Sequence, residues 1–249
     1  MADDSTLART RSAYFADSRS PLTSLAFVAP LLVVYEAGVF WLGPDAMHNG
    51  VAVWLREFLN LLGLTQYLLL PILVCSVLLA WHHLGHYPWR VSSRTLAFMT
   101  LESLTYAIVL WIVARVQGMV FGELDLHIPC AIEGRQIVAY CGAGIYEELL
   151  FRLMLLPTVA GLIHLTGVKQ RESYLASVLI TSIIFSLAHY QLISSSGDPF
   201  QWFSFCFRVL AGIYFAMLFL YRGFGIAAGA HTIYDVLIAV AATYHAGTS

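Results

Sequence analysis

Residues 136–156 read QIVAYCGAGIYEELLFRLMLL, an apolar stretch of about the 20 residues that an α-helix needs to cross a bilayer. The stretch nevertheless contains two carboxylates and a guanidinium, those of Glu147, Glu148 and Arg152. Ionisable groups inside a bilayer are costly, and they usually mark a functional site. To infer the fold and the activity, it is therefore necessary to know whether this stretch lies in lipid and which groups its charged side chains contact.

The composition of the whole chain is typical of a membrane protein. Of the 249 residues, 59% are hydrophobic and only 11% are charged, with a mean hydropathy of +0.74. A soluble domain carries roughly 25% charged residues. The formal net charge is −2 and no basic patch occurs, which argues against a nucleic-acid partner. The four cysteines form no CxxC pair and are interpreted as small apolar residues, not as disulfides or metal ligands.

Apolar runs predict seven membrane spans in one all-α polytopic bundle, because only helices and closed barrels satisfy the backbone in lipid. A polar cytoplasmic segment, residues 1–20, is expected to precede a membrane domain over residues 21–249. An amphipathic stretch, residues 49–64, is expected to lie at the membrane interface and adds an eighth element if it crosses. The expected spans are 21–41, 66–84, 96–117, 136–156, 174–190, 200–221 and 224–244.

The basic residues predict the orientation, because Lys and Arg concentrate in cytoplasmic loops. The side of the bundle that holds the amino terminus carries most of them, whereas the opposite side carries Arg56 and Arg135. The amino terminus is therefore expected in the cytoplasm. The basic residues on the amino-terminal side are Arg9, Arg11, Arg19, Arg90, Arg94, Lys169, Arg171 and Arg222.

Helical spacing separates the three charges of the opening stretch. Glu148 and Arg152 are four residues apart and share a face, so they are expected to form an ion pair. Glu147 lies about 100° from Glu148 around the helix and is not placed to pair with the same arginine. Glu147 therefore needs a partner on another helix, a water-filled cavity or a proton of its own. A purely structural alternative pairs Glu147 with Arg208 of the sixth span.

Two later spans supply candidate partners for Glu147. The sequence FSLAHY places Phe185 and His189 four residues apart, on one helical face. The sequence GAHTIYD does the same for His231 and Asp235. Three helices thus offer a carboxylate base, two imidazoles and a further carboxylate, which together are the material of a hydrolytic site.

Two details of the packing around these motifs are also expected. Gly225 and Gly229 form a GxxxG pattern, which predicts the close approach of another helix and would bring His231 near the fourth or fifth span. His189 falls at the end of the fifth span, so this helix is expected to continue to about Ser195.

In this order, the motifs EExxxR (147–152), FxxxH (185–189) and HxxxD (231–235) resemble those of the CAAX protease and bacteriocin-processing family, also called Abi-type. The resemblance covers a motif-bearing core of about residues 136–240. It implies a metal-independent, glutamic-type intramembrane endopeptidase that needs no cofactor and hydrolyses a peptide bond with an activated water. The implied partners are a membrane-associated peptide or protein substrate and the bilayer, and the implied location is a bacterial inner membrane.

The resemblance also implies roles for individual residues. Glu147 would activate the water with the help of His189, and His231 and Asp235 would lie where the oxyanion forms. The prenyl-protein proteases of the family have asparagine where Asp235 stands, and an ionised aspartate cannot donate a hydrogen bond to an oxyanion. Asp235 is therefore expected either to orient His231 or to be protonated, and orientation is the preferred interpretation. The residues implied as structural support of the site are Glu148, Arg152 and Phe185.

Two other functions remain open from the sequence. His189, His231 and a glutamate are suitable zinc ligands, although the chain has no HExxH helix. Intramembrane Glu, His, Asp and Arg also line ion pathways, which leaves an ion transporter or a non-catalytic membrane adaptor as a further alternative. The hydropathy contains no inverted repeat that would favour a transporter.

Overall fold

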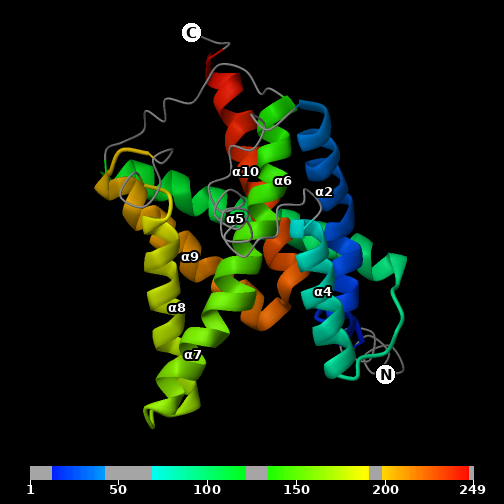
Figure 1. Ribbon diagram of the computed structural model, residues 1–249. Coiled ribbons are helices and arrows are strands. Elements are labelled where there is room, and N and C mark those ends of the chain that lie inside the picture. The colour runs from blue at the N-terminus through cyan, green and yellow to red at the C-terminus, as the bar shows by residue number, and fades with distance from the viewer. Residues whose placement is uncertain (1–12, 43–68, 122–133, 191–197, 247–249) are drawn as a thin grey trace, which may run out of the picture.

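The computed structural model of the protein describes residues 13–42, 69–121, 134–190 and 198–246, and this part of the chain is an all-α bundle (Figure 1). A short helix over residues 13–18 precedes the long ones. The longer elements are α2 (Pro21–Leu42), α4 (Leu69–Leu84), α5 (Ser93–Phe121), α6 (Gly134–Glu148), η2 (Leu149–Leu155), α7 (Leu156–Leu165), α8 (Gln170–Leu187), α9 (Trp202–Arg222) and α10 (Phe224–Ala246).

The helices confirm the predicted class of an all-α integral membrane protein. Among the described residues, four segments are long and apolar enough to cross a membrane: Pro21–Leu42, Ser93–Val120, Gln136–Leu165 and Trp202–Arg222. Two shorter apolar helices, Leu70–Leu84 and Phe224–Val240, accompany them. Each predicted span overlaps one of the observed helices, in chain order. The amphipathic stretch 49–64 lies outside the described residues.

Two predicted helix ends are wrong. The fourth span does not stop before Pro157, because the helical segment continues to Leu165. Pro157 lies in the first turn of α7, directly after the π-helical segment η2. The fifth span does not continue to about Ser195, because α8 already ends at Leu187. Ala188 and His189 follow in a turn, and Tyr190 pairs with Asp198 in an isolated bridge.

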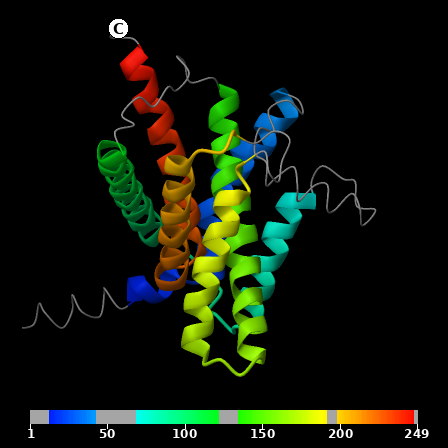
Figure 2. The same ribbon diagram turned by 90° about the vertical axis from the view of Figure 1, so that its left-hand side faces the viewer.

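The arrangement of the helices brings the motif-bearing segments together. In Figures 1 and 2, α6 stands beside both α2 and α10, and α7 and α8 form an antiparallel hairpin. Helix α8 packs along α9, and α5 crosses obliquely against α10. A large apolar core, built from α2, α4, α6, η2 and α8, includes Val28, Leu78, Ile145 and Phe185. The segment from Glu147 to Arg152 therefore lies inside the protein and not on its lipid-facing surface.

The GxxxG pattern of α10 does not face the helix that the sequence suggested. A Cβ at Gly225 would meet Met99 and Ser24, and one at Gly229 would meet Phe27 and Ser103, so both glycines admit α5 and α2. The close contact with α6 depends instead on Gly144. A Cβ at Gly144 would lie 1.9 Å from Oγ1 of Thr232 and 2.9 Å from the carbonyl oxygen of Ala228, so no larger residue fits between these helices.

A second polar cluster ties the amino-terminal helix to the bundle. Nη2 of Arg222 donates to Oε2 of Glu102 at 2.7 Å and to the hydroxyl of Ser18 at 3.2 Å. The hydroxyl of Tyr14 donates to the same carboxylate, and the ring of Phe15 lies 4.1 Å from the guanidinium. This cluster pairs the charges of Arg222 and Glu102 and is separate from the motifs that follow.

Candidate functional site

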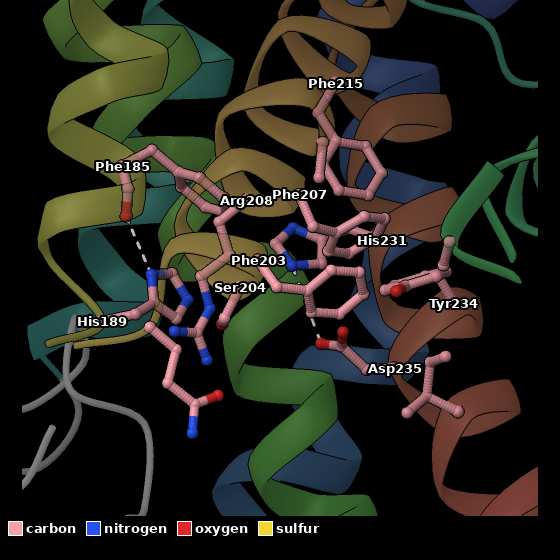
Figure 3. Close-up of a pocket in the computed structure, with 14 residues that line it drawn as sticks. Phe185, His189, Phe203, Ser204, Phe207, Arg208, Phe215, His231, Tyr234 and Asp235 are labelled. Carbon is pink, nitrogen blue, oxygen red and sulfur yellow. Dashed lines mark hydrogen bonds and ion pairs between the residues drawn. The ribbon is translucent and has the colours of Figure 1, made fainter. Parts of the chain in front are cut away.

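The predicted site residues come together from three places in the fold. Glu147 occupies the last turn of α6, His189 follows the end of α8, and His231 and Asp235 lie one turn apart on α10. Figure 3 shows His189, His231 and Asp235 around one cavity. Glu147 and His231 are 84 positions apart in the chain and are neighbours in the fold. This is the proximity that the sequence motifs on separate spans predicted.

The carboxylate of Glu147 faces both imidazoles. Its Oε2 lies 3.6 Å from Nε2 of His189 and 3.8 Å from Nε2 of His231. Both distances exceed a direct hydrogen bond and suit a bridge through one water-sized molecule. Oε2 is buried and accepts no hydrogen bond from any residue within the described ranges. The lone pairs of this oxygen therefore have no hydrogen-bond donor among the described residues.

The backbone fixes the ring of His189. Its Nδ1 lies 2.8 Å from the carbonyl oxygen of Phe185, one helical turn earlier. A carbonyl oxygen can only accept, so Nδ1 carries the hydrogen, and in the neutral ring Nε2 is left as an acceptor. Because α8 ends at Leu187, His189 stands in the turn beyond the helix and faces the carboxylate of Glu147.

Glu148 has two partners, of which the sequence indicated only one. Its Oε1 lies 3.2 Å from Nη1 of Arg152, which confirms the predicted ion pair. The same oxygen lies 2.8 Å from Nδ1 of His231 on α10. Glu148 is fully buried and Arg152 is 2% exposed. Glu148 therefore orients a site histidine as well as neutralising an arginine, a link across helices that spacing within one helix cannot predict.

Arg152 is held among aromatic rings. It lies in the π-helical segment η2, and its Nη2 donates to the carbonyl oxygen of Gly212 on α9 at 3.3 Å. The guanidinium is 4.4 Å from the ring centre of Phe185 and 5.7 Å from that of Phe215. A π-helical turn widens the helix by one residue, and such turns are frequent at functional sites. Here it follows the Glu147–Glu148 pair directly.

The same two phenylalanines contact the histidines. The ring of His231 stacks on Phe215 with centroids 4.4 Å apart and an interplanar angle of 14°. Phe185 meets His189 edge-on at 4.9 Å. Phe185 thus contacts both Arg152 and His189, two of the residues beside which the family resemblance places it, whereas nothing in the sequence indicated the contacts of Phe215.

Asp235 lies on the cavity side of His231. Its Oδ2 is 3.7 Å from Nε2 of His231, which is longer than a hydrogen bond. Because Glu148 holds Nδ1 of the same ring at 2.8 Å, the closer orienting contact comes from Glu148 and not from Asp235. The Asp235 side chain is 21% exposed and lines the cavity.

The cavity beside these residues has a volume of about 470 Å³. One part of its wall is aromatic and includes Phe203, Phe207 and Phe215, all on α9 (Figure 3). Another part is polar and contains His189, His231, Asp235 and Arg208. Glu147 is not among the residues that line the cavity, but both histidines that its carboxylate faces are. The histidines therefore connect Glu147 with the cavity.

Arg208 does not pair with Glu147, which was the structural alternative considered for this glutamate. Its Nη2 donates to Oδ2 of Asp198 at 2.6 Å, and its guanidinium lies 5.0 Å from the ring centre of Tyr190. The partners observed for Glu147 in the described part of the chain are therefore the two histidines.

The described part of the chain contains residue types that can bind a metal ion, but it does not gather three of them into one site. No group of three His, Cys, Asp or Glu side chains within the described ranges is placed to hold a metal ion. Cys75, Cys141 and Cys206 are free thiols, and Cys130 lies outside the described residues.

Comparison with known proteins identifies the part of the chain that carries the site. No curated protein and no solved structure matches the sequence. Residues 135–237 match the family model described as "Type II CAAX prenyl endopeptidase Rce1-like". The match starts at the helix of Glu147 and ends just after Asp235, so it includes all three motifs and supports an intramembrane protease. The resemblance indicated by the motifs is thereby confirmed: residues 135–237 of this chain are similar to the CAAX-protease family.

Proposed function

We propose that this protein hydrolyses a peptide bond of a membrane-associated peptide or protein, with Glu147 as the base that activates a water molecule. The observation that carries the proposal is the Oε2 atom of Glu147, which is buried, accepts no hydrogen bond within the described structure and faces two Nε2 atoms at 3.6 Å and 3.8 Å. A general base must reach the proton that it abstracts directly or through one water, and this arrangement meets that condition.

Water activation would use Glu147 and His189 together. Nε2 of neutral His189 and Oε2 of Glu147 are both acceptors, and a hydrogen bond spans about 2.8 Å, so one water can donate to both across their 3.6 Å separation. The water oxygen then keeps its lone pairs free to attack the scissile carbonyl carbon. Glu147 takes one proton from the water and returns it to the departing amine nitrogen, so that no net proton is gained or lost.

Stabilisation of the tetrahedral intermediate would come from His231. Its Nδ1 is held by Glu148, so the role requires a hydrogen on Nε2 as well, and therefore an imidazolium. Three carboxyl groups surround this ring, those of Glu147, Glu148 and Asp235, and they balance its charge. Asp235 lines the cavity together with His231 and would lie close to the bound substrate.

The cavity favours an apolar substrate segment. Its aromatic wall of Phe203, Phe207 and Phe215 suits apolar side chains or a hydrocarbon chain, and the family description names prenylated substrates. An extended peptide with apolar side chains would bury these next to the phenylalanines and present its backbone carbonyl to the histidines. The location proposed for this reaction is a bacterial inner membrane, with the amino terminus in the cytoplasm.

The test replaces the base without changing its shape. Glu147→Gln should lower cleavage by a factor of about 10² to 10⁴, the usual contribution of a general base. The matched control is Glu172→Gln, because Glu172 is exposed in the first turn of α8. Comparative proteomics of cells that carry each variant should show uncut precursors in Glu147→Gln cells alone. A folded Glu147→Gln protein whose cells process the same precursors as wild type would contradict the proposal.

A further inference from the structure

A second cavity lies at the end of the bundle where α2 begins and α4 and α9 end (Figure 1). This interfacial cavity has a volume of about 670 Å³, and its wall includes Arg19, Trp81, Arg90, Phe219 and Leu220. It shares no lining residue with the cavity beside the histidines. None of the residues of its wall takes part in the proposed reaction.

The ends of the spans place the interfacial cavity at the boundary between lipid and water. Arg19 precedes the span Pro21–Leu42 by two residues, and Leu220 lies in the last turn of the span Trp202–Arg222. Arg90 lies in the connection between α4 and α5. Basic pockets between membrane helices at this depth are typical binding sites for lipid headgroups.

Two guanidinium groups and one carboxylate supply the charge of the interfacial cavity. Nη2 of Arg90 lies 3.7 Å from Oδ1 of Asp17, which also lines the cavity, so these two opposite charges offset each other. Nη2 of Arg19 donates to the carbonyl oxygen of Leu220 at 3.4 Å, which is an uncharged acceptor. One positive charge is therefore in excess, and it matches a ligand that carries one negative charge.

Much of the remaining wall is apolar. Trp81 packs against Phe219 with ring centres 6.4 Å apart, and Phe15 and Pro88 also line the cavity. A guanidinium fits phosphate oxygens with two parallel hydrogen bonds, whereas the apolar side chains fit a hydrocarbon chain. This combination suits a molecule that has both a phosphate and an acyl chain, and it suits a soluble phosphate ester less well.

We propose that the interfacial cavity binds an anionic phospholipid. Its phosphodiester contacts Arg19 and Arg90, and an acyl chain lies against Trp81 and Phe219. The arginines could instead serve only to set the orientation of the chain in the membrane. That role requires neither a cavity nor a preference for one lipid over another, so lipid binding separates the two explanations.

The test measures lipid binding to purified, delipidated protein in a neutral detergent by native mass spectrometry. The probes are dioleoyl phosphatidylglycerol and dioleoyl phosphatidylcholine, which share their acyl chains and a phosphodiester. The choline carries a cation that cancels the phosphate charge. Wild-type protein should bind the first phosphatidylglycerol about tenfold more tightly than phosphatidylcholine, the size of one charge-assisted hydrogen bond. Equal affinities for the two lipids would overturn the inference.

Variants assign the preference to the interfacial cavity. Arg19→Gln should lose most of the preference for phosphatidylglycerol. Ala16→Trp should weaken the binding of both lipids without changing any charge, because Ala16 lines the cavity and an indole there would occupy part of it. The matched control is Arg94→Gln, which removes an exposed arginine near the start of α5 that does not line the cavity.

The control should retain the full preference. An equal loss in Arg94→Gln and Arg19→Gln would indicate general attraction to a basic surface and would overturn the inference. Lipid binding that is unchanged in Ala16→Trp would do the same. The wild-type comparison of the two lipids needs no variant, so it decides the question even if a variant fails to fold.

Glycerol phosphate distinguishes a lipid site from a site for soluble phosphate esters. It carries the phosphate without acyl chains, so a large excess should not displace phosphatidylglycerol from the wild-type protein. Displacement would assign the cavity to a soluble ligand and reject the lipid. Glu147→Gln should bind phosphatidylglycerol as the wild type does, so the outcome for the lipid is independent of the outcome for the proposed reaction.

Discussion

The buried contact of Glu148 with both Arg152 and His231 gives a prediction whose size follows from the structure. Glu148→Gln keeps the oxygen that accepts from Nδ1 of His231 but leaves the charge of Arg152 unpaired among aromatic rings. Arg152→Met fills the same aromatic space with an apolar side chain and leaves Glu148 with His231 alone. Removing one partner of a buried ion pair costs about 3–5 kcal/mol, so each single variant should lose about that much unfolding free energy.

The double variant distinguishes a coupled pair from two independent effects. Glu148→Gln with Arg152→Met leaves no unpaired charge at this position, so its loss of stability should be smaller than that of either single variant. Independent effects would instead add to about 6–10 kcal/mol, the sum of two single losses. Both residues are at most 2% exposed, so solvent screening does not weaken the coupling.

The assay is reversible unfolding of the purified protein in mixed detergent micelles, carried out for the wild type, both single variants and the double variant. The control is Arg90→Met, which breaks the pair between Arg90 and Asp17, where the arginine side chain is 74% exposed. Its loss should remain below about 1 kcal/mol. Additive losses in the double variant, or single losses no larger than that of the control, would refute the assignment of Glu148 and Arg152 as a coupled buried pair.

Three further outcomes follow from other contacts. Gly144→Ala should destabilise the protein and lower cleavage, because its Cβ would lie 1.9 Å from Oγ1 of Thr232, whereas Gly161→Ala, which meets no atom within 4 Å, should leave thermal unfolding and activity unchanged. Glu102→Gln should lower the thermal unfolding temperature, because it leaves the buried Arg222 unpaired, while cleavage by the folded protein persists. Elemental analysis of active, chelator-treated protein should find no stoichiometric zinc, and a loss of activity that zinc restores would favour the metal-dependent alternative.

The helices and the ion pair between Glu148 and Arg152 could be predicted because both depend on local periodicity. Apolar runs of membrane length give the spans, and a spacing of four residues places two side chains on one face. The convergence of Glu147, His189 and His231 was predicted from the presence of three unexplained ionisable motifs on separate spans. An ionisable residue in a bilayer costs free energy unless it has a partner. Where its own helix supplies none, the residue indicates a contact with another helix.

What could not be predicted depends on contacts between segments distant in the sequence. The hydrogen bond from His231 to Glu148 requires the register of α10 against α6, which Gly144 and Thr232 set. The GxxxG pattern gave a correct tendency toward close packing but the wrong neighbours, because small residues permit a contact without specifying its partner. The end of α8 at Leu187 was missed for a similar reason, since apolar composition alone does not mark where a helix stops.

The intramembrane charges show why Glu147 stands apart from the other carboxylates. Arg152 lies against Glu148, Arg222 against Glu102, and Arg208 against Asp198, so each of these cations has a carboxylate partner. Glu147 is different, because its neighbours are two imidazoles whose charge depends on a proton. A permanent ion pair would hold Glu147 ionised and fully occupied, whereas a pair of histidines leaves a proton free to move among three groups. That difference is the physical reason to place the proposed proton transfer at Glu147 and not at Glu148, its equally buried neighbour in the sequence.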